Sequence, residues 1–506
     1  MAKSTSALLE ENVTLRSRVD QQATTIDQKD RRIQHLEELI RALRHRQFGS
    51  SSEQTPPEQE RLFDQGADLE EVPAAAEPIA VKGHQRARRG RPRLSDDLPR
   101  VDVIHDLTEA EKVCAEHGCA LTPMGEEASE QLEFKPAELY VLRHIQKKYT
   151  CPCCEGHVVT AAKPPQPIPK SMATPSLLAW ITVSKYQDAL PLYRQSAIFE
   201  RLGVHLDRTT LANWMIACGQ LVQPLINLLW DQIRQMPVVH MDETPVQVLA
   251  EPGRKPQSKS YMWVTAAGPP NAGTVLFHYA PTRSGQVPKD LLGDYAGALM
   301  VDGYEGYDGL CTTTQIERLG CWAHARRKFV EAQRLQPKGK TGTPDQALAL
   351  INKLYGVERS LKGATTDEVH DARQAQAILL LDRLHVWLEK ALPRTAPGTA
   401  TGKAMSYLHN QWPRLTRYTE NGVYPIDNNR AENAIRPFVI GRKNWLFSQS
   451  QRGVTASANL YSLIETAKGH GLNPHDYLLQ LFAELPKAVN ISDFEALLPA
   501  NFKNGE

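Results

Sequence analysis

The sequence has no long apolar run. Its longest apolar stretch, LLAWITV at residues 177–183, is far shorter than the ~20 apolar residues that a membrane-spanning helix needs. The opening residues, MAKSTSALLEEN, also lack the apolar core of a signal peptide. We therefore expect a cytoplasmic protein, associated with the nucleoid if it acts on DNA.

Net charge and cysteine are also scarce. The 59 basic and 58 acidic residues give a net charge of +1, but residues 50–80 carry eight acids and one arginine, whereas residues 82–93 carry six bases and no acid. Five of the eight cysteines fall within residues 114–154. In a chain without an export signal, this clustering favours a metal site over a disulfide framework.

Proline and glycine are absent from residues 8–43, which form five heptads. One core position of the heptad holds mostly β-branched residues and the other mostly leucine, although Gln22 and Lys29 interrupt the second. This division favours a parallel two-stranded coiled coil in which Asn12 fixes the register. The alternative is an amphipathic helix that packs on its own chain.

Three acidic residues stand in short signatures: Asp242 in VVHMDETPV, Asp302 in ALMVDGYEGY and Glu432 in IDNNRAENAIRP. The two aspartates end β-type apolar runs, and the glutamate lies at a helix start. Among 58 acidic residues, any such trio could be solvated surface groups. Carboxylates are nevertheless the ligands that suit two divalent cations held about 3.5–4 Å apart for phosphoryl transfer.

The segments between these acids predict the fold. After the VVHMD strand we expect strands at residues 261–268 and 274–281, a helix in GQVPKDLLGDYAG and a fourth strand in ALMVDG. A three-stranded meander, a crossover helix and a fourth strand match the ribonuclease H-like α/β fold. Asp242 and Asp302 then lie at the ends of its first and fourth strands.

Four motifs, HMDETPV, VDGYEGY, GCWAHARRKF (320–329) and IDNNRAENAIRPFVIGRKNWLFSQSQRG (426–453), resemble the insertion-sequence 66 family of bacterial DDE transposases. The resemblance implies that Asp242, Asp302 and Glu432 are the catalytic triad and bind two Mg²⁺ ions, with Mn²⁺ as a substitute. It implies DNA strand cleavage at the ends of a mobile element, followed by 3′-hydroxyl strand transfer into target DNA. It also implies an N-terminal leucine-zipper-like segment and small accessory proteins encoded by the same element.

Two other classes of function remain open. A metal-dependent nuclease would cleave DNA without joining it to a target, and a catalytically inactive regulator would only bind DNA. The three acids in matching signatures disfavour the regulator, and a test for joined products separates the nuclease. In the transposase interpretation, a homodimer or higher oligomer would pair two active sites with two DNA ends.

A structural zinc site is expected in residues 101–162. Two ligand pairs, Cys114-x4-Cys119 and Cys151-x2-Cys154, are separated by 31 residues, and tetrahedral Zn²⁺ takes four such ligands. Cys153 competes with Cys154, and His117 competes with a cysteine of the first pair. The sequence between the pairs resembles the zinc-finger segment of the family, although the first pair departs from the more usual CxxC spacing.

Two segments are candidates for DNA binding outside the acids. RRGRPRL resembles an AT-hook core, in which Arg88, Arg89 and Arg91 would enter a narrow minor groove, although a basic linker that contacts phosphates is an equal alternative. Residues 191–221 predict a helix-turn-helix whose second helix would place Arg208, Thr209 and Asn213 near bases. Two helices packed in a core would give the same pattern.

Basic residues also accompany the acids. We expect contacts with DNA phosphates from His324, Arg326 and Arg327 upstream and from Arg430, Arg436, Arg442 and Lys443 around Glu432. An exposed basic helix face is the alternative. Glu432 and Arg436 are four residues apart and so share a helix face. The 130 residues between Asp302 and Glu432 exceed what the fold needs, so an all-α insertion is expected there, as a DNA clamp or a passive scaffold.

The predicted fold class is multi-domain α/β, with a ribonuclease H-like catalytic domain that contains the all-α insertion. The predicted segments are a coiled coil (1–47), a linker with the AT-hook-like core (48–100), a zinc-finger module (101–162), a helix-turn-helix-like region (163–235), the first part of the catalytic domain (236–332), the all-α insertion (333–424), the second part of the catalytic domain (425–455) and a C-terminal helical region (456–506).

Overall fold

The computed structural model describes residues 5–48, 139–150, 158–313, 315–336 and 341–502. Contacts divide the chain into two compact units, residues 1–67 with 146–506 and residues 68–145, and the elements below belong to the first. Within the described ranges, no helix has both the length and the apolar character needed to cross a membrane.

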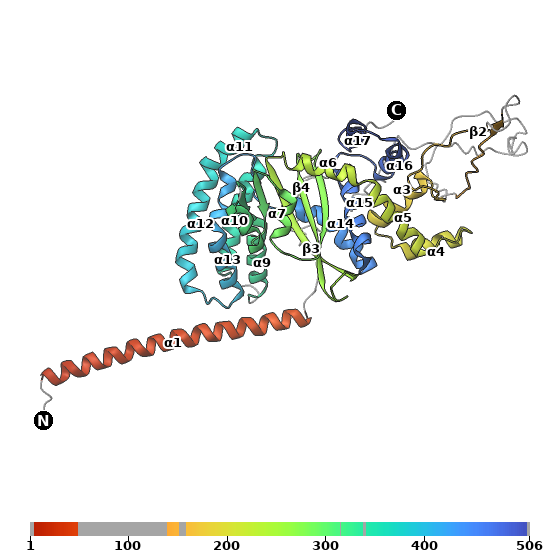
Figure 1. Cartoon of the computed structure of the whole chain (residues 1–506). Helices are drawn as coiled ribbons and strands as arrows, with labels where there is room; N and C mark the ends of the chain where they lie inside the picture. The colour runs from red at the N-terminus through yellow and green to blue at the C-terminus, as the bar shows by residue number, and fades with distance from the viewer. Residues whose placement is uncertain (1–4, 49–138, 151–157, 314, 337–340, 503–506) are drawn as a thin grey trace, which may run out of the picture. The chain divides into compact units, whose positions relative to one another are not determined.

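A mixed sheet of six strands forms the centre of the unit (Figure 1). Its strands are β3 (Val238–Ala250), β4 (Lys259–Ala267), β5 (Thr274–Ala280), β6 (Ala298–Val301), β7 (Glu317–Gly320) and β8 (Ser448–Ser450). The order is β5-β4-β3-β6-β7, and β8 pairs with the distal part of β3. β4 is antiparallel to β3 and β5, whereas β3, β6 and β7 run parallel.

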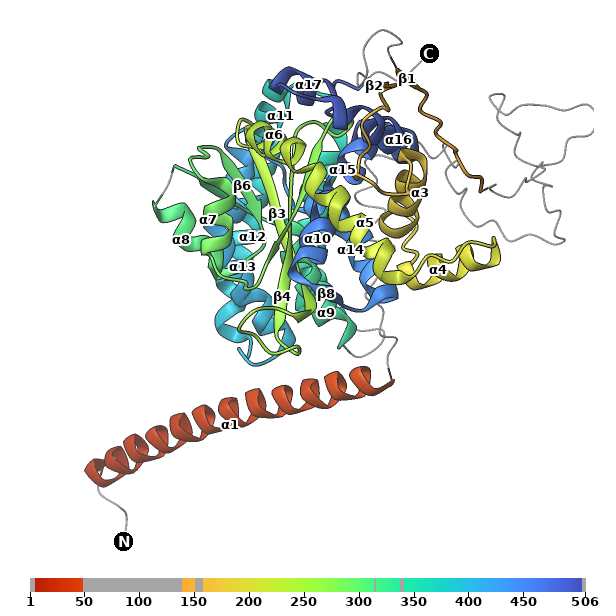
Figure 2. The ribbon, with the colours of Figure 1, turned by 45° about the vertical axis from the view of Figure 1, so that its right-hand side comes forward.

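The expected meander and crossover helix are both found. β3, β4 and β5 follow one another as antiparallel neighbours, and α7 (Gln286–Leu292) leads from β5 to β6. Figure 2 shows β3 and β4 as the long strands of the sheet. The short β7 and β8 had no clear signal in the sequence. Parallel β6 is buried at all four residues, which explains its continuous apolar sequence ALMV.

Helices from two distant parts of the chain share one core with the sheet. They are α3 (Pro175–Tyr186), α4 (Leu192–Arg201), α5 (Arg208–Leu221), α6 (Gln223–Ile233), α14 (Asn429–Trp445), α15 (Gln451–Gly469), α16 (Pro474–Glu484) and α17 (Ile491–Ala496). α15 packs on β5 and α5, and α16 packs on α3. At the α5–α15 crossing, a Cβ on Gly219 would lie 2.5 Å from Ala456 Cβ, so the close approach requires glycine.

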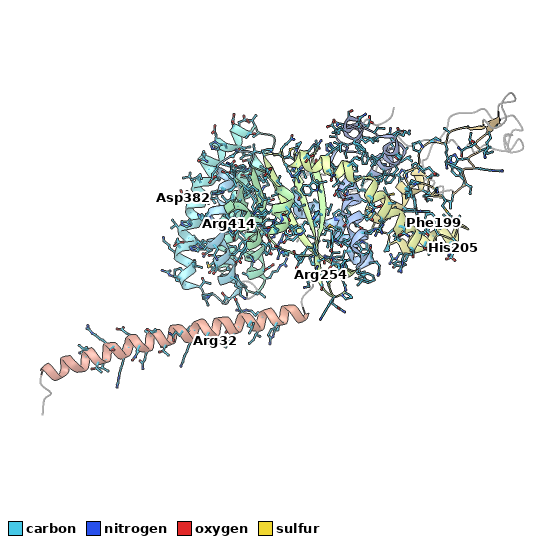
Figure 3. All side chains as sticks on the ribbon, in the orientation of Figure 1. Arg32, Phe199, His205, Arg254, Asp382 and Arg414 are labelled. Atoms are coloured by element: carbon cyan, nitrogen blue, oxygen red, sulfur yellow. The ribbon has the colours of Figure 1, made fainter. Side chains whose placement is uncertain are left out.

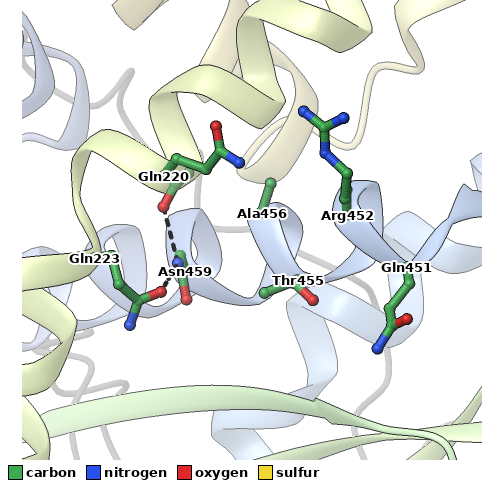
Figure 4. Close-up of a pocket in the computed structure, with 8 residues that line it drawn as sticks. Gln220, Gln223, Gln451, Arg452, Thr455, Ala456 and Asn459 are labelled. Atoms are coloured by element: carbon green, nitrogen blue, oxygen red, sulfur yellow. Dashed lines mark hydrogen bonds between the residues drawn. The ribbon is translucent and has the colours of Figure 1, made fainter.

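A polar pocket of about 290 Å³ lies beside this crossing (Figure 4). Its polar lining side chains are Gln220, Gln223, Gln451, Arg452, Thr455 and Asn459. The Asn459 amide donates to Gly219 O and Gln223 Oε1, at 2.8 Å each, and so joins α15 to α5 and α6. None of the three signature acids lines this pocket.

The region between the sheet and α14 is helical. It contains α8 (Asp308–Thr313), α9 (Trp322–Arg334), α10 (Thr343–Ser360), α11 (Thr366–Ala372), the π-helical η2 (Arg373–Ala377), α12 (Ile378–Ala391) and α13 (Ala400–Leu415). α9, α10, α12 and α13 enclose a second apolar core around Phe329, Ile351, Leu384 and Leu408. Figure 1 shows these helices on the opposite side of the sheet from α15 and α16. The helices expected between Asp302 and Glu432 are therefore present.

At the N-terminus, α1 is a single helix over Thr5–Phe48. Core residues of the predicted heptads, including Val19, Ile26, Ile33 and Ile40, are each more than half exposed. An apolar stripe of this length, without cover from its own helix, suits pairing with another helix.

Candidate active site

Asp242 and Asp302 lie side by side at the carboxyl ends of neighbouring parallel strands. β3 and β6 pair from Val238 with Ala298 to His240 with Met300, a constant offset of 60 residues. Continued by two residues, the same register places Asp302, just after β6, opposite Asp242. Adjacent strands lie ≈ 4.8 Å apart, so the backbones hold the two aspartates close together.

Asp242 lies in a concentration of negative charge. Burial raises the pKa of its carboxyl well above the ordinary value, and the nearby Glu243, Glu432 and Asp302 raise it further. The one backbone bond that opposes this shift is donated by Glu243 N to Asp242 Oδ1, at 2.9 Å. The surroundings therefore favour either a protonated Asp242 or a cation beside it.

The segment after Asp302 is held by hydrogen bonds to its backbone and side chain. Asp302 Oδ1 accepts from Tyr304 N at 2.9 Å. The guanidinium of Arg318, on β7, donates to Asp302 O at 2.8 Å and to Tyr304 O at 2.9 Å. Arg318 is also paired with Asp308. These bonds fix the turn that presents the Asp302 carboxylate.

Glu243, the neighbour of Asp242, points into a separate network. Its side chain is 2% exposed, and its Oε1 accepts from Arg283 Nε at 2.5 Å. Its other oxygen accepts from Tyr307 Oη at 2.8 Å. Arg283 lies over the Tyr304 ring at 3.8 Å, and Tyr304 Oη donates to Arg283 O at 2.6 Å. Glu243 thereby connects β3 to the segment that follows Asp302.

Glu432 enters from the first turn of α14, which packs on β3 and β4. Asn428, fully buried, precedes this helix, and its carbonyl accepts from Glu432 N at 3.2 Å. The Asn428 side chain donates to Met241 O at 2.8 Å and lies 3.1 Å from His240 Nδ1. Asn428 therefore positions the helix start, and with it Glu432, against β3.

Two residues of α9 meet Glu432. Arg327 Nη2 donates to Glu432 Oε2 at 2.5 Å, and His324 Nδ1 lies 3.3 Å from Glu432 Oε1. Burial lowers the pKa of His324, against the opposing effect of Glu432. Among the described residues, the group of three ligating side chains within 4.8 Å of one another is Cys321, His324 and Glu432, and not the three acids.

The other basic residues around the acids divide by their partners. Arg326 is buried and donates to Asn352 Oδ1 at 3.0 Å, inside the second core. Arg430 donates to the carbonyls of Ala267 and Pro269 at 2.8 and 3.1 Å, and Arg442 donates to Thr244 Oγ1 at 2.9 Å. These three side chains support the fold. Arg436 is half-buried and Lys443 is exposed on α14.

A family model described as "Transposase IS66 family" matches residues 170–456, more than half of the chain. The chain belongs to the IS66 transposase family. The resemblance in the four motifs is thereby confirmed, and the acids lie in a domain of the DDE type. Membership implies a transposase that uses divalent metal ions and acts on DNA.

Three further family models match other parts of this IS66 transposase. "Transposase C of IS166 homeodomain", a leucine-zipper model, matches residues 35–103, "zinc-finger binding domain of transposase IS66" matches 111–155, and "IS66 C-terminal element" matches 462–500. The chain therefore has a zinc-finger module. Its candidate ligands Cys114, Cys119, Cys151 and Cys154, with the rivals His117 and Cys153, lie outside the described residues. The second pair falls between the antiparallel strands β1 (Lys148–Thr150) and β2 (Val158–Thr160).

Curated relatives cover nearly the whole chain. "Uncharacterized protein y4jD" of Sinorhizobium fredii (strain NBRC 101917 / NGR234) is 32% identical, over 96% of this chain and 98% of its own length. "Uncharacterized protein y4qI" of the same organism is 31% identical, over 93% of this chain and 89% of its own length.

The predicted helix-turn-helix has the expected geometry in the transposase. α4 ends at Arg201, Gly203 adopts a φ of +83°, and Asp207 caps α5 by accepting from Thr210 N at 2.8 Å. Arg208, Thr209 and Asn213 are exposed on α5. The AT-hook candidates Arg88, Arg89 and Arg91 lie outside the described residues.

Several residues of this site escaped sequence reasoning. Glu243 and Asn428 adjoin recognised motifs, but their roles depend on partners 40 to 188 residues away. Cys321 was grouped only with the other cysteines. Its spacing from His324, Cys-x2-His at the start of a helix, was a usable signal for a ligand pair.

Proposed function

We propose that this IS66 transposase cleaves DNA at the ends of a mobile element and transfers the freed 3′-hydroxyl into target DNA, with Asp242, Asp302 and Glu432 as its catalytic acids. The observation that carries the proposal is the β3–β6 register, which brings the two aspartates together across 60 residues of sequence. The antiparallel meander joined by a crossover helix to parallel β6 and β7 supports a ribonuclease H-like fold.

The acids fit two divalent ions, Mg²⁺ with Mn²⁺ as a substitute. Hard cations take carboxylate oxygens, and the raised pKa of Asp242 reports uncompensated negative charge at this position. Glu432 Oε1 is buried without a hydrogen-bond partner. When bound, such ions activate the attacking oxygen and neutralise the leaving one. The sequence-based assignment of Zn²⁺ to the finger cysteines is retained as part of this proposal.

The chain itself supplies orientation and positive charge. Arg318 and Tyr304 hold the Asp302 turn, Asn428 holds the start of α14, and Arg327 fixes one oxygen of Glu432. His324 lies beside the same glutamate, so both α9 side chains border the space that a scissile phosphate would occupy. Arg436 lies one turn beyond Glu432 on α14, where it would contact the same DNA strand.

DNA contacts farther from the acids are assigned to exposed groups. Arg208, Thr209 and Asn213 on α5 are available for base edges, and Lys443 on α14 is available for phosphate. Arg88, Arg89 and Arg91 remain candidates for the minor groove. Arg326, Arg430 and Arg442 are left out because their described partners are structural.

Mobilisation of a marked element in bacterial cells tests the triad. Glu432→Gln keeps the volume of the side chain and its bond from Arg327 but loses the charge. We expect at least about a hundredfold loss of transposition, since the loss of one preorganised electrostatic group costs ≈ 10²–10³ in rate. Binding to element ends and protein level should stay unchanged.

Glu495→Gln, an exposed glutamate of α17, is the matched control and should transpose normally. Transposition by Glu432→Gln at the control level would mean that another acid completes the site. Cleaved but unjoined ends from the wild type would instead identify a nuclease.

We also propose that α1 pairs with α1 of a second copy and so brings two catalytic units to two element ends. The exposed stripe of Val19, Ile26, Ile33 and Ile40 supports this. Deletion of residues 1–45 should abolish the joint complex of two DNA ends in a gel-shift assay while single-end binding persists. Intact pairing after the deletion would remove α1 from this role.

A further inference from the structure

Beside the proposed catalytic acids lies a second type of donor set. Cys321 caps the start of α9, His324 follows in its first turn, and Glu432 lies in the first turn of α14. One ligand atom from each of these residues lies within 4.8 Å of the other two. Tetrahedral ligands at zinc bond lengths of 2.0–2.3 Å are separated by ~3.5 Å, so little movement would bring all three around one ion.

The donor types select against Mg²⁺. A thiolate and an imidazole are the preferred ligands of Zn²⁺ and Co²⁺, whereas Mg²⁺ requires oxygen and keeps several waters. A Cys-His-carboxylate set provides three protein ligands and leaves one position open, as in exchangeable rather than purely structural zinc sites. These residues therefore differ in chemistry from the Asp242, Asp302 and Glu432 set, although they share Glu432 with it.

Two of the three ligand atoms have no other role in the described structure. His324 Nδ1 and Glu432 Oε1 are both buried, face each other at 3.3 Å, and make no hydrogen bond among the described residues. Arg327 occupies the other oxygen of Glu432 and so turns Oε1 toward His324. Cys321 Sγ accepts from Asn428 N, a bond that a metal-bound thiolate also accepts. Buried polar atoms without partners are rare, and an unmodelled ion is one of their standard explanations.

We propose that Cys321, His324 and Glu432 form a binding site for a thiophilic divalent cation, Zn²⁺ in the cell, and that its occupancy withdraws Glu432 from the catalytic metal set. The second half of the proposal rests on the function proposed above. Zinc at this site would hold the transposase inactive, and its removal would release Glu432 to act with Asp242 and Asp302.

Co²⁺ is the probe for the site, because Co²⁺ bound by thiolate absorbs light and Zn²⁺ does not. Full-length protein with its zinc finger loaded is titrated with Co²⁺ and followed by absorption. The wild type should develop a thiolate–cobalt band that excess Zn²⁺ removes. Cys321→Ser should lose this band, and His324→Ala should weaken Co²⁺ binding at least tenfold, since even partners outside the ligand set change metal affinity by 10–100-fold.

Cys311→Ser is the matched control, because Cys311 is a free, half-buried cysteine outside the donor set. It should keep the band. Any exchange of Co²⁺ into the zinc finger would contribute equally to all variants, so the difference between Cys321→Ser and Cys311→Ser isolates the proposed site. Metal-free melting curves identify a variant that fails to fold, and His324→Ala provides the test if Cys321→Ser does. Identical bands in the wild type, Cys321→Ser and His324→Ala overturn the proposal.

Inhibition is measured separately, as Mg²⁺-dependent strand cleavage with added Zn²⁺. Zn²⁺ should inhibit the wild type and Cys311→Ser at concentrations at least tenfold below those that inhibit Cys321→Ser. Equal inhibition of all three would overturn the regulatory half while the cobalt band still defined the site. Normal cleavage by Glu432→Gln in Mg²⁺ would instead refute the proposed catalytic role and leave the band unaffected in the wild type.

Discussion

Glu243 offers a sharp test of how this transposase positions its acids, because it contacts neither α9 nor α14 in the described hydrogen bonds. Glu243→Gln keeps the shape of a side chain that is 2% exposed but removes its charge. The bonds from Arg283 and Tyr307 then become weaker. Since Arg283 and Tyr304 hold the segment after Asp302, the change should loosen Asp302 relative to Asp242.

The magnitude follows from the two hydrogen bonds. A bond to a charged group contributes ≈ 1.5–3 kcal/mol and a neutral one ≈ 0.5–1.5 kcal/mol, so two bonds lose about 2 kcal/mol in all. Arg283 is 39% exposed and can regain water, and Asp242 loses one repelling neighbour. We therefore expect a net loss of about 1–2 kcal/mol in the free energy of unfolding. Transposition should fall at least tenfold, because a misplacement of 1 Å at the reacting groups can cost 10²-fold.

Glu251→Gln is the matched control. Glu251 is 3% exposed, pairs with Arg254 at 3.0 Å and accepts from Tyr279, so it repeats the Glu-Arg-Tyr network. It lies nine residues beyond Asp242 along β3, about 30 Å at 3.3 Å per residue. Arg254 is labelled near the lower end of the sheet in Figure 3.

The two variants should lose similar stability in thermal melting, but only Glu243→Gln should lose transposition. Equal loss of transposition by both variants would show that the effect is one of folding. Full activity of Glu243→Gln at reduced stability would show that the network does not position Asp302.

Two further predictions concern the same site. Asn428→Ala removes the bond to Met241 O and the contact with His240, and leaves buried groups without partners at about 1–3 kcal/mol each. Chemical denaturation should therefore show a loss of about 2–5 kcal/mol, whereas the exposed Asn501→Ala should change little, and an unchanged Asn428→Ala would contradict the role of Asn428. The raised pKa of Asp242 means that the metal-free protein holds a proton there, which Mg²⁺ must displace, so Mg²⁺ affinity should increase with pH by up to tenfold per unit below that pKa. Calorimetric titrations at pH 6, 7 and 8 check this, with a flat profile expected for Asp242→Asn, and a flat profile for the wild type would refute it.

Local sequence patterns were sufficient for much of the fold. β4 and β5 are apolar β-type runs separated by a Gly/Pro/Asn turn, and the capped α5 begins immediately after the expected Asp207. The short β7 and β8 were missed because three or four residues carry too little periodicity. β8 is also stabilised by pairing with Val248 and Ala250, some 200 residues earlier, which no local signal reveals.

Charge alone was a poor guide to DNA contact near the acids. Arg326, Arg327 and His324 lie within four residues on one helix, yet Arg326 faces Asn352 in the second core while the other two face Glu432. The helical periodicity separates them, since residues 324 and 327 are one turn apart and share a face. Arg430 was likewise assigned to phosphate, but its guanidinium binds carbonyls at the β4–β5 turn.

The candidate site depends on two different means of bringing distant residues together. Asp242 and Asp302 meet because neighbouring parallel strands fix a register, and this part of the geometry follows from the sheet alone. Glu432 has no such register, because a helical region with its own core separates it from β6. Its position depends on Asn428, on Arg327 and on the packing of α14 against β3. Glu432 is therefore the acid whose position is easiest to change, which is consistent with its place in both the catalytic set and the proposed zinc site.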